Sequence, residues 1–341
     1  MRKAIFWVAI ILLITATFLG CSGLSLWSNA ENGSGPKNTN SSTTREAVTI
    51  LTGGTSGVYF PLGGALAEIY HRNLNVAVSF QSTGASAENC YKLARGKGEL
   101  AFAMADTVSD AYYGQGRFEG KPLTNIRGLS AMYSNYLHLI TTKDKGIASL
   151  ADIRGKRVAV GAHGSGTEIN AKRVLIAAGL TYDDIEEHFL SFAEAIQGLR
   201  DETIDVAVLS SGIPNIAVSK LAAEKQLVLI PVSHKIITKL QEVSPAYTDV
   251  IIPGATYPGV DTNIATVGVK NLIVTREELS EEFVYKLTKV IFENTDFLRS
   301  THAAADNILL DTAVEGMPIP LHQGAERYYR EMGVLEPQVS P

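Results

Sequence analysis

The sequence predicts an α/β protein built from two lobes. Short apolar segments alternate with segments of helical periodicity from about residue 46 to residue 298, which is typical of sheets flanked by helices. Two glycine-rich turns, at 52–57 and 161–167, each follow an apolar segment and begin an amphipathic helix. The chain has 341 residues, which is too long for one ordinary core and sufficient for two.

The two lobes are expected to divide the chain unevenly. The first takes residues 46–139 and 265–341, and the second takes residues 140–264. Predicted strands at 137–141 and 265–274 lie at these boundaries, so they are expected to cross between the lobes as a two-strand hinge. The similarity of the two glycine-turn units suggests related lobe cores, although a strand, a glycine turn and a helix often occur together in α/β proteins.

Apolar runs and helical spacing define the expected elements. Strands are expected at 48–51, 76–79, 100–104, 137–141, 157–160, 206–209, 227–232 and 265–274. Helices are expected at 61–71, 85–95, 108–113, 150–153, 167–178, 192–200, 213–223, 277–294 and 325–331. Pro61 suits the first position of a helix, and Ser165 with Glu168 is typical of a capping box.

The composition excludes two classes of protein. The chain is 45% hydrophobic and 19% charged with a net charge of -5, so it is neither intrinsically disordered nor a nucleic-acid binder. No basic patch with interleaved aromatic residues is present to hold phosphodiesters, so no nucleic-acid partner is expected.

The first residues predict export and membrane attachment. Arg2 and Lys3 precede an apolar segment at 4–19, which is shorter than the ~20 residues that a membrane-spanning helix needs. The segment ends at Cys21, an arrangement similar to a bacterial lipobox, so residues 1–20 are expected to be a signal peptide and Cys21 to be lipidated. Phe18 departs from the aliphatic residue usual at its position, and an ordinary secretory signal or an uncleaved anchor remains the alternative.

Residues 21–45 are expected to form a flexible tether. This segment is rich in Ser, Asn, Thr and Gly, so it has too little apolar surface to fold. Beyond the tether, Cys90 is the only other cysteine, and no internal disulfide is expected. Cys90 shares helical spacing with Leu93 and Ala94, which predicts a buried small apolar residue.

The glycine turns predict an anion site. A helix N-terminus carries unpaired backbone N–H groups and about half a positive charge. Glycine lets an anion approach that backbone closely. Two such turns, at 52–57 and 161–167, would hold a small acid from both sides if they faced one another.

Other familiar chemistries lack their required residues. The second turn has the glycine spacing of a P-loop, but Thr167 and Glu168 stand where lysine and a hydroxyl residue are needed. Neither turn is a GxGxxG dinucleotide motif, and no serine lies in a GxSxG elbow. The seven histidines show neither an HExxH motif nor an i, i+4 pair. We therefore expect no catalytic residue, no metal site and no cofactor.

Polar side chains beside the turns favour capture of a small polar ligand. Thr55, Ser56, Ser165 and Thr167 place hydroxyl groups beside free backbone donors. Tyr59 offers an aromatic wall with a polar tip.

Further junctions repeat the pattern. Asp106 follows the strand segment 100–105, and the turns at 82–86 and 210–214 each precede a helix. Each single residue is equally consistent with a helix cap, but four junctions together favour a binding site. His163 lies within the second turn, where it either contacts ligand or is an exposed loop residue.

Five segments resemble one known family. They are TGGTSGVYFPLGG at 52–64, DTVSDAY at 106–112, GKRVAVGAHGSGTEIN at 155–170, TDVIIPGATYPG at 248–259 and LHQGAERYYRE at 321–331. Together they resemble the TAXI family, the extracytoplasmic solute receptors of TRAP-type transporters. The resemblance covers the chain from about residue 48 to residue 333.

The resemblance implies a fold and a function. The fold is that of type II periplasmic binding proteins, with two α/β lobes, a two-strand hinge and a ligand in the cleft. The partner is a fused TRAP permease that uses an ion gradient. The ligand is a small carboxylate, with glutamate, a related amino acid or a dicarboxylate implied most often. The protein would lie outside the cytoplasm, anchored to the bacterial membrane by its lipid.

The resemblance also implies ligand contacts. By position these are Gly54, Thr55, Tyr59, Thr83, Ser86, Gly164, Ser165, Gly166 and Thr167, with Asn170, Ser211 and Tyr257 as further candidates. The sequence departs from the family at three places. His163 and Gln323 stand where the family often has proline, and Glu202 replaces a frequent glycine. His163 is kept as a ligand candidate because it lies in the predicted carboxylate turn.

Two alternatives remain from the sequence. In the first, the chain is the same kind of binding protein but serves an ABC importer or a sensor. In the second, the chain is a secreted enzyme that acts on an amino acid, with Asp106 and Glu168 as candidate acids. No base and nucleophile pair supports the enzyme, so the receptor is preferred.

Overall fold

The computed structural model describes residues 47–336. The predicted signal peptide, Cys21 and the predicted tether lie outside the described residues. Within the described part of the chain, none of the helices has both the length and the apolar character needed to cross a bilayer.

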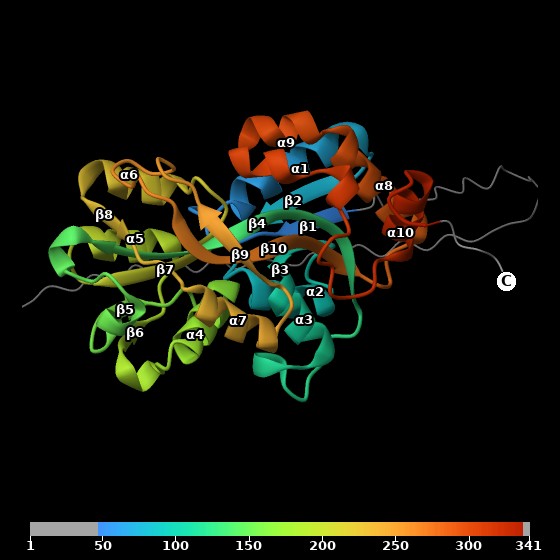
Figure 1. Cartoon of the computed structure of the whole chain (residues 1–341). Coiled ribbons are helices and arrows are strands. Elements are labelled where there is room, and N and C mark those ends of the chain that lie inside the picture. Colours follow the sequence, from blue (N-terminus) through green and yellow to red (C-terminus); the bar gives the residue numbers. More distant parts are fainter. Residues whose placement is uncertain (1–46, 337–341) are drawn as a thin grey trace, which may run out of the picture. The chain divides into compact units, whose positions relative to one another are not determined.

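The described residues form one mixed sheet of ten strands (Figure 1). The strands are β1 (Ala47–Leu51), β2 (Ala77–Gln81), β3 (Leu100–Met104), β4 (Ile126–Thr142), β5 (Arg157–Ala159), β6 (Glu186–His188), β7 (Val206–Ser211), β8 (Leu227–Leu229), β9 (Tyr247–Ile252) and β10 (Ile264–Arg276). Their order is β2-β1-β3-β10-β4-β7-β5-β6, with β8 paired to β4 and β9 paired to β10.

Two long strands join the two halves of the sheet. β4 and β10 run antiparallel to one another through the middle. The parallel strands β1, β2 and β3 continue from β10, and the parallel strands β7, β5 and β6 continue from β4. This arrangement confirms the predicted fold class of two α/β lobes joined by two strands. The residue boundaries of the lobes stay a prediction.

Ten α-helices are present within residues 47–336. They are α1 (Tyr59–Asn73), α2 (Ser86–Ala94), α3 (Ala105–Tyr113), α4 (Gly166–Ala177), α5 (Phe192–Arg200), α6 (Ile216–Glu224), α7 (His234–Val243), α8 (Glu281–Glu293), α9 (Thr295–Thr301) and α10 (Gln323–Glu331). Figure 1 shows α1 and α9 on one side of β1 and β2, and α2 and α3 on the other. We call β1–β3 with α1–α3 and α8–α10 the first lobe, and β5–β8 with α4–α6 the second lobe.

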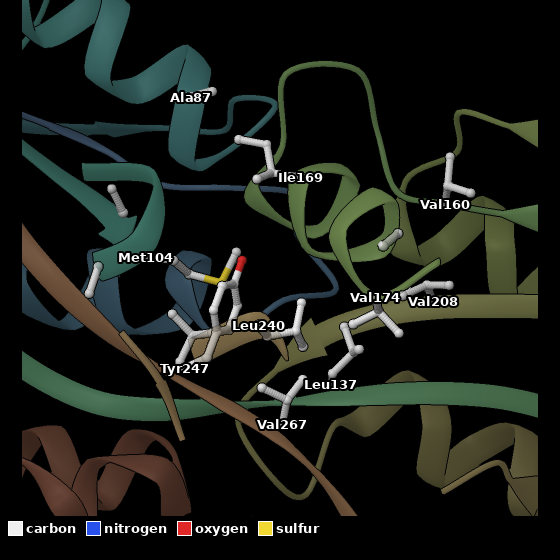
Figure 2. Close-up of a cluster of buried hydrophobic side chains, with 14 of the residues drawn as sticks. Ala87, Met104, Leu137, Val160, Ile169, Val174, Val208, Leu240, Tyr247 and Val267 are labelled. Atoms are coloured by element: carbon white, nitrogen blue, oxygen red, sulfur yellow. The ribbon is translucent and has the colours of Figure 1, made fainter. Parts of the chain in front are cut away.

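One apolar core is shared by both lobes. Met104 at the end of β3 and Ala87 on α2 belong to the same buried cluster as Ile169 and Val174 on α4 (Figure 2). Cys90 lies in this cluster with no exposed surface, as predicted. The packing of α4 against residues of the first lobe brings the two glycine turns close to one another.

The predicted elements differ from the structure in extent. β4 begins at Ile126, eleven residues before the predicted strand, because its residues are buried on both faces and show no alternation. α3 begins at Ala105 directly after β3, whereas the prediction placed its start at 108. α6 begins at Ile216, because the Asn215 side chain accepts hydrogen bonds from the N–H groups of Ala217 and Val218 and caps it there.

Four elements were missed entirely. β6 and α9 are short, with three and seven residues, and leave a weak periodic signal. β9 is exposed along most of its length and is held by its register with β10, a contact distant in sequence. α7 has a clear apolar face in Ile237 and Leu240, and this periodicity was overlooked.

Candidate functional site

A cavity of about 90 Å³ lies where the two lobes meet. It is lined by Gly53, Gly54, Gly57, Val58, Tyr59, Thr83, Gly84, Ala85, Ser86, Met104, Tyr133, Asn135, Ala162, Ser165, Gly166, Thr167, Ser191, Phe192, Ser210 and Ser211. Every one of these side chains is uncharged.

Four helices begin at this cavity. The turns before α1 and α2 reach it from the first lobe, and the turns before α4 and α5 reach it from the second. The first N–H groups of a helix have no intrahelical acceptor, and the helix dipole favours negative charge there. The convergence of four N-termini makes the cavity electropositive without a cationic side chain.

Residues of both glycine turns line the cavity, and the second turn also contacts the start of α2. The carbonyl oxygen of Gly164 accepts hydrogen bonds from the N–H groups of Ala87 and Glu88, at 3.2 and 3.1 Å. A Cβ added to Gly166 would lie 2.2 Å from Met104 Cε and 2.8 Å from Ser86 Oγ. Glycine at position 166 therefore permits the close approach of the second turn to the first lobe.

Five hydroxyl groups of the second lobe line the cavity, those of Ser165, Thr167, Ser191, Ser210 and Ser211. Ser165 Oγ accepts from the N–H of Glu168 at 3.0 Å, which confirms half of the predicted capping box. The Glu168 carboxylate does not complete the box, because it pairs with Arg117 at 3.2 Å. Thr167 Oγ1 accepts from the N–H of Ser210 at 3.4 Å, and Ser211 Oγ accepts from Asn215 Nδ2 at 3.0 Å.

A row of hydrogen-bonded side chains supports the other wall. Tyr59 donates its hydroxyl hydrogen to Asn271 Oδ1, and Asn271 Nδ2 donates to Asn135 Oδ1 at 2.8 Å. Asn135 Nδ2 in turn donates to the carbonyl oxygen of Ser210 at 3.0 Å. Tyr133 also lines the cavity, and its buried hydroxyl has no hydrogen-bond partner within residues 47–336. Burial raises the pKa of both phenols, so each is a neutral donor.

A buried ionic cluster lies behind the second turn. The Asp106 carboxylate accepts hydrogen bonds from Asn170 Nδ2 at 2.7 Å, Tyr247 Oη at 2.8 Å and Arg173 Nη1 at 3.1 Å. Asn170 Oδ1 accepts from Ser210 Oγ at 2.9 Å, so Asn170 connects this cluster to the cavity wall. Asp110 completes the cluster, and burial raises the pKa of its carboxyl although Arg173 is adjacent.

A second buried cluster lies behind β7. Tyr257 Oη donates to His138 Nε2 at 2.8 Å and accepts from the N–H of Asn215 at 3.0 Å. His138 Nδ1 lies 2.9 Å from the carbonyl oxygen of Tyr136, so it is the nitrogen that carries the proton. Burial lowers the pKa of His138 to about 4. The neutral imidazole therefore holds Tyr257 and, through it, Asn215 in place.

The sequence profile of the NMT1-like family matches residues 50–333. This chain belongs to the NMT1-like family. Among the solved structures that resemble it, two have TM-scores of 0.50 and 0.53. PhnD1 of Prochlorococcus marinus, in complex with methylphosphonate, is 11% identical with a TM-score of 0.53, covering 85% of this chain and 99% of that protein. A protein of Bordetella bronchiseptica is 16% identical with a TM-score of 0.50, covering 87% and 91%.

A third solved structure is the periplasmic aliphatic sulphonate binding protein SsuA of Escherichia coli. It is 14% identical with a TM-score of 0.45, covering 84% of each chain. The likeness to PhnD1 shows the fold of the NMT1-like chain, which is that of the periplasmic binding proteins.

The NMT1-like fold places the predicted ligand residues in two groups. Those that line the cavity are Gly54, Tyr59, Thr83, Ser86, Ser165, Gly166, Thr167 and Ser211. Those that do not line it are Thr55, His163, Gly164, Asn170 and Tyr257. Thr55 and His163 are exposed, and the His163 ring stacks on Phe189 with a centroid distance of 3.8 Å. That any of these residues binds a ligand stays a prediction.

Several lining residues of the NMT1-like chain were missed. Tyr133 and Asn135 lie within the part of β4 that was not predicted, so nothing placed them at the cavity. Ser191 and Phe192 follow the short strand β6. The sequence did contain a signal for these two residues. Ser191 and Glu194 form a capping box at the start of α5, the helix expected at 192–200, and its N-terminus is a further place where a ligand can bind.

Proposed function

We propose that this NMT1-like chain is an extracytoplasmic receptor that captures a small carboxylate between two lobes and delivers it to a membrane permease. One observation carries the proposal: four helix N-termini, two from each lobe, begin at one uncharged cavity. A carboxylate has the charge and the acceptor oxygens that such a site binds. The carboxylates we favour are glutamate, a related amino acid or a dicarboxylate.

Contacts from both lobes give the receptor a means to close on its ligand. The carbonyl oxygen of Gly164 meets the N-terminus of α2, and Asn215 Nδ2 donates to the carbonyl oxygen of Ser56 at 3.2 Å. A ligand that bridges the same surfaces stabilises the closed form over an open one by its differential affinity. Release then follows when a permease favours the open form.

The permease we propose is a fused TRAP permease of the TAXI type, with the receptor held at the membrane by lipidated Cys21. The segments at 52–64 and 155–170, which resemble that family, support this choice. The alternative partner is an ABC importer. A gene for a fused TRAP permease beside the gene of this chain supports the proposal, whereas an adjacent ATPase gene opposes it.

The ligand class is tested by thermal unfolding of the purified chain with a panel of small carboxylates. A ligand at one hundred times its dissociation constant adds about 2.7 kcal/mol to the folded state. For a chain of this size that is a rise of several degrees in the unfolding temperature. The absence of a response to every carboxylate of the panel would contradict the proposal.

Two threonine variants test whether the cavity is the binding site. Thr167→Ala removes a hydroxyl that lines the cavity, so affinity for the carboxylate found by the panel is expected to fall about fivefold. Thr55→Ala is the matched control, because Thr55 belongs to the other glycine turn but is exposed and does not line the cavity. Equal effects of the two substitutions, measured by calorimetry, would place the ligand elsewhere.

A further inference from the structure

Three of the five hydroxyl groups that the second lobe places at the cavity have a hydrogen to donate to a ligand, whereas Ser191 and Ser210 donate theirs to Glu194 and Asn170. Ser165, Thr167 and Ser211 each accept a hydrogen bond from a protein N–H, at 3.0, 3.4 and 3.0 Å. Each oxygen therefore already receives one donor, and its own hydrogen is left for another acceptor. The backbone N–H groups at the starts of α4 and α5 add further donors. These groups are suited to acceptor oxygens of a ligand.

The carbonyl groups around the cavity are already engaged. The carbonyl oxygens of Gly54, Ala162 and Ser191 accept from the N–H groups of Gly57, Ser165 and Ala195, at 3.0, 3.0 and 2.9 Å. Other carbonyls accept from side chains or helix N–H groups in the same way: Gly53 from Ser82 Oγ at 2.9 Å, Ser210 from Asn135 Nδ2 at 3.0 Å, and Ala85 from the N–H of Asn89 at 2.9 Å. Each of these six carbonyl oxygens thus already accepts one hydrogen bond within the protein, and no carboxylate is among the residues that line the cavity.

The acidic side chains nearest to the cavity also have hydrogen-bond or ion-pair partners within the protein. Asp106 accepts hydrogen bonds from four side chains, including that of Arg173. Glu88 accepts from the N–H of Gly84 and pairs with Lys92, and these partners lower the pKa of its carboxyl. Glu168 pairs with Arg117, and Glu194 accepts from Ser191.

We propose that the ligand of this cavity is a carboxylate without an ammonium group, such as a 2-oxo acid or a dicarboxylate, rather than a 2-amino acid. This inference rests on the proposed function and narrows its ligand class. An ammonium group brings three donors into a site that already presents donors, and it loses its hydration there. A buried charge without acceptors and a counter-charge is costly. A 2-oxo group instead brings one more acceptor for the same hydroxyls.

The proposal is tested by calorimetry of the purified chain with pairs of acids that share one carbon skeleton. Suitable pairs are 2-oxoglutarate with L-glutamate, pyruvate with L-alanine, and succinate with L-aspartate. In every pair that binds, the acid without an amine is expected to bind at least about tenfold more tightly. An amino acid that binds as tightly as its partner overturns this inference and leaves the receptor function standing. Failure of every carboxylate to bind overturns the receptor function itself.

A variant pair tests the physical reason. Ser211→Asp places a carboxylate at the cavity wall, where it keeps the hydrogen bond from Asn215 Nδ2. The preference for the amine-free acid is expected to shift toward the amino acid by at least about tenfold. Ser211→Asn is the control, because it has the same shape without the charge. Equal shifts in the two variants overturn the argument from charge, and unfolding temperatures of both variants establish that each is folded.

Discussion

Arg173 on α4 forms a bidentate ion pair with Asp110 on α3, with Nη2 at 2.8 and 2.7 Å from the two carboxylate oxygens. The two residues lie 63 positions apart and belong to different lobes. The Arg173 side chain is 16% exposed and that of Asp110 is 5% exposed, so the pair is largely shielded from water. Because Arg173 also reaches Asp106, one guanidinium balances two buried carboxylates.

Replacement of this arginine is expected to be severely destabilising. Arg173→Met leaves Asp106 and Asp110 buried without a counter-charge, which typically costs about 3–5 kcal/mol. The loss is read from urea unfolding at pH 7. Without the guanidinium the folded protein binds protons more readily than the unfolded chain, so the destabilisation is expected to shrink as the pH falls.

The control for this variant is an exposed pair. Arg200 bonds to Glu224 through two nitrogens on the surface of the second lobe, and Arg200→Met is expected to cost less than about 1 kcal/mol. A similar loss in both variants, or a loss for Arg173→Met that does not change with pH, would refute the role assigned to the buried cluster.

His138 is expected to make the protein less stable in mild acid. Burial lowers the pKa of His138 to about 4, whereas histidine in an unfolded chain titrates near 6.5. The unfolded chain therefore binds the proton first, and the stability contributed above pH 6.5 is lost as the pH falls toward 4. Between pH 7 and pH 5 this loss is about 2 kcal/mol, measurable by urea unfolding.

His138→Gln is expected to remove the part of the pH dependence of stability that comes from His138. Burial lowers the pKa of His302 and His322 too, so a smaller loss persists in the variant. An unchanged slope for His138→Gln would show that the proton is taken up elsewhere.

Gly166 and Gly64 are expected to respond differently to alanine. A Cβ at Gly166 meets Ser86 Oγ at 2.8 Å and Met104 Cε at 2.2 Å, across the lobe interface. Gly166→Ala is expected to hinder closure and to weaken ligand binding by about tenfold, since overpacking costs about 1–3 kcal/mol. Gly64 does not line the cavity, and a Cβ there meets only Phe80 at an ordinary 3.4 Å, so Gly64→Ala should bind as before. Calorimetry with one ligand measures the affinity of both variants. Equal affinities would count against the close approach of the second glycine turn to the first lobe.

The general architecture could be predicted from the sequence because it depends on local patterns. The glycine turns follow β1 and β5 directly, so their places at the carboxyl ends of strands follow from strand and helix periodicity alone. Eight of the thirteen candidate ligand residues, most of them implied by the family resemblance, line the cavity. The strand β3 was predicted with its observed bounds, because it is short, continuously apolar and bounded by turns.

The rest depended on contacts between residues distant in sequence. Asn170 and Tyr257 are polar residues that the motif suggests as ligand contacts, yet both are fully buried behind the wall. Their partners, Asp106 and His138, lie 64 and 119 positions away. No local pattern separates a polar side chain that faces a cavity from one that supports it. Tyr133 was missed for the converse reason, because it lies inside a long strand whose neighbours are buried on both faces.

Tyr133 supplies the last prediction. Its hydroxyl is buried and lacks a hydrogen-bond partner within residues 47–336, an arrangement that costs the folded protein free energy unless a ligand provides the acceptor. Tyr133→Phe removes only that oxygen. The affinity for the carboxylate is expected to fall about tenfold, whereas the unliganded protein should be as stable as the parent or slightly more stable.

Tyr70 on α1 is the matched control for this substitution. Its hydroxyl is also buried without a partner among the described residues, but Tyr70 belongs to the core of the first lobe and does not line the cavity. Tyr70→Phe is therefore expected to change stability in the same direction and to leave the dissociation constant unchanged. Calorimetry and urea unfolding on both variants separate the two effects. If Tyr133→Phe bound the ligand as tightly as Tyr70→Phe, the Tyr133 hydroxyl would have no part in recognition.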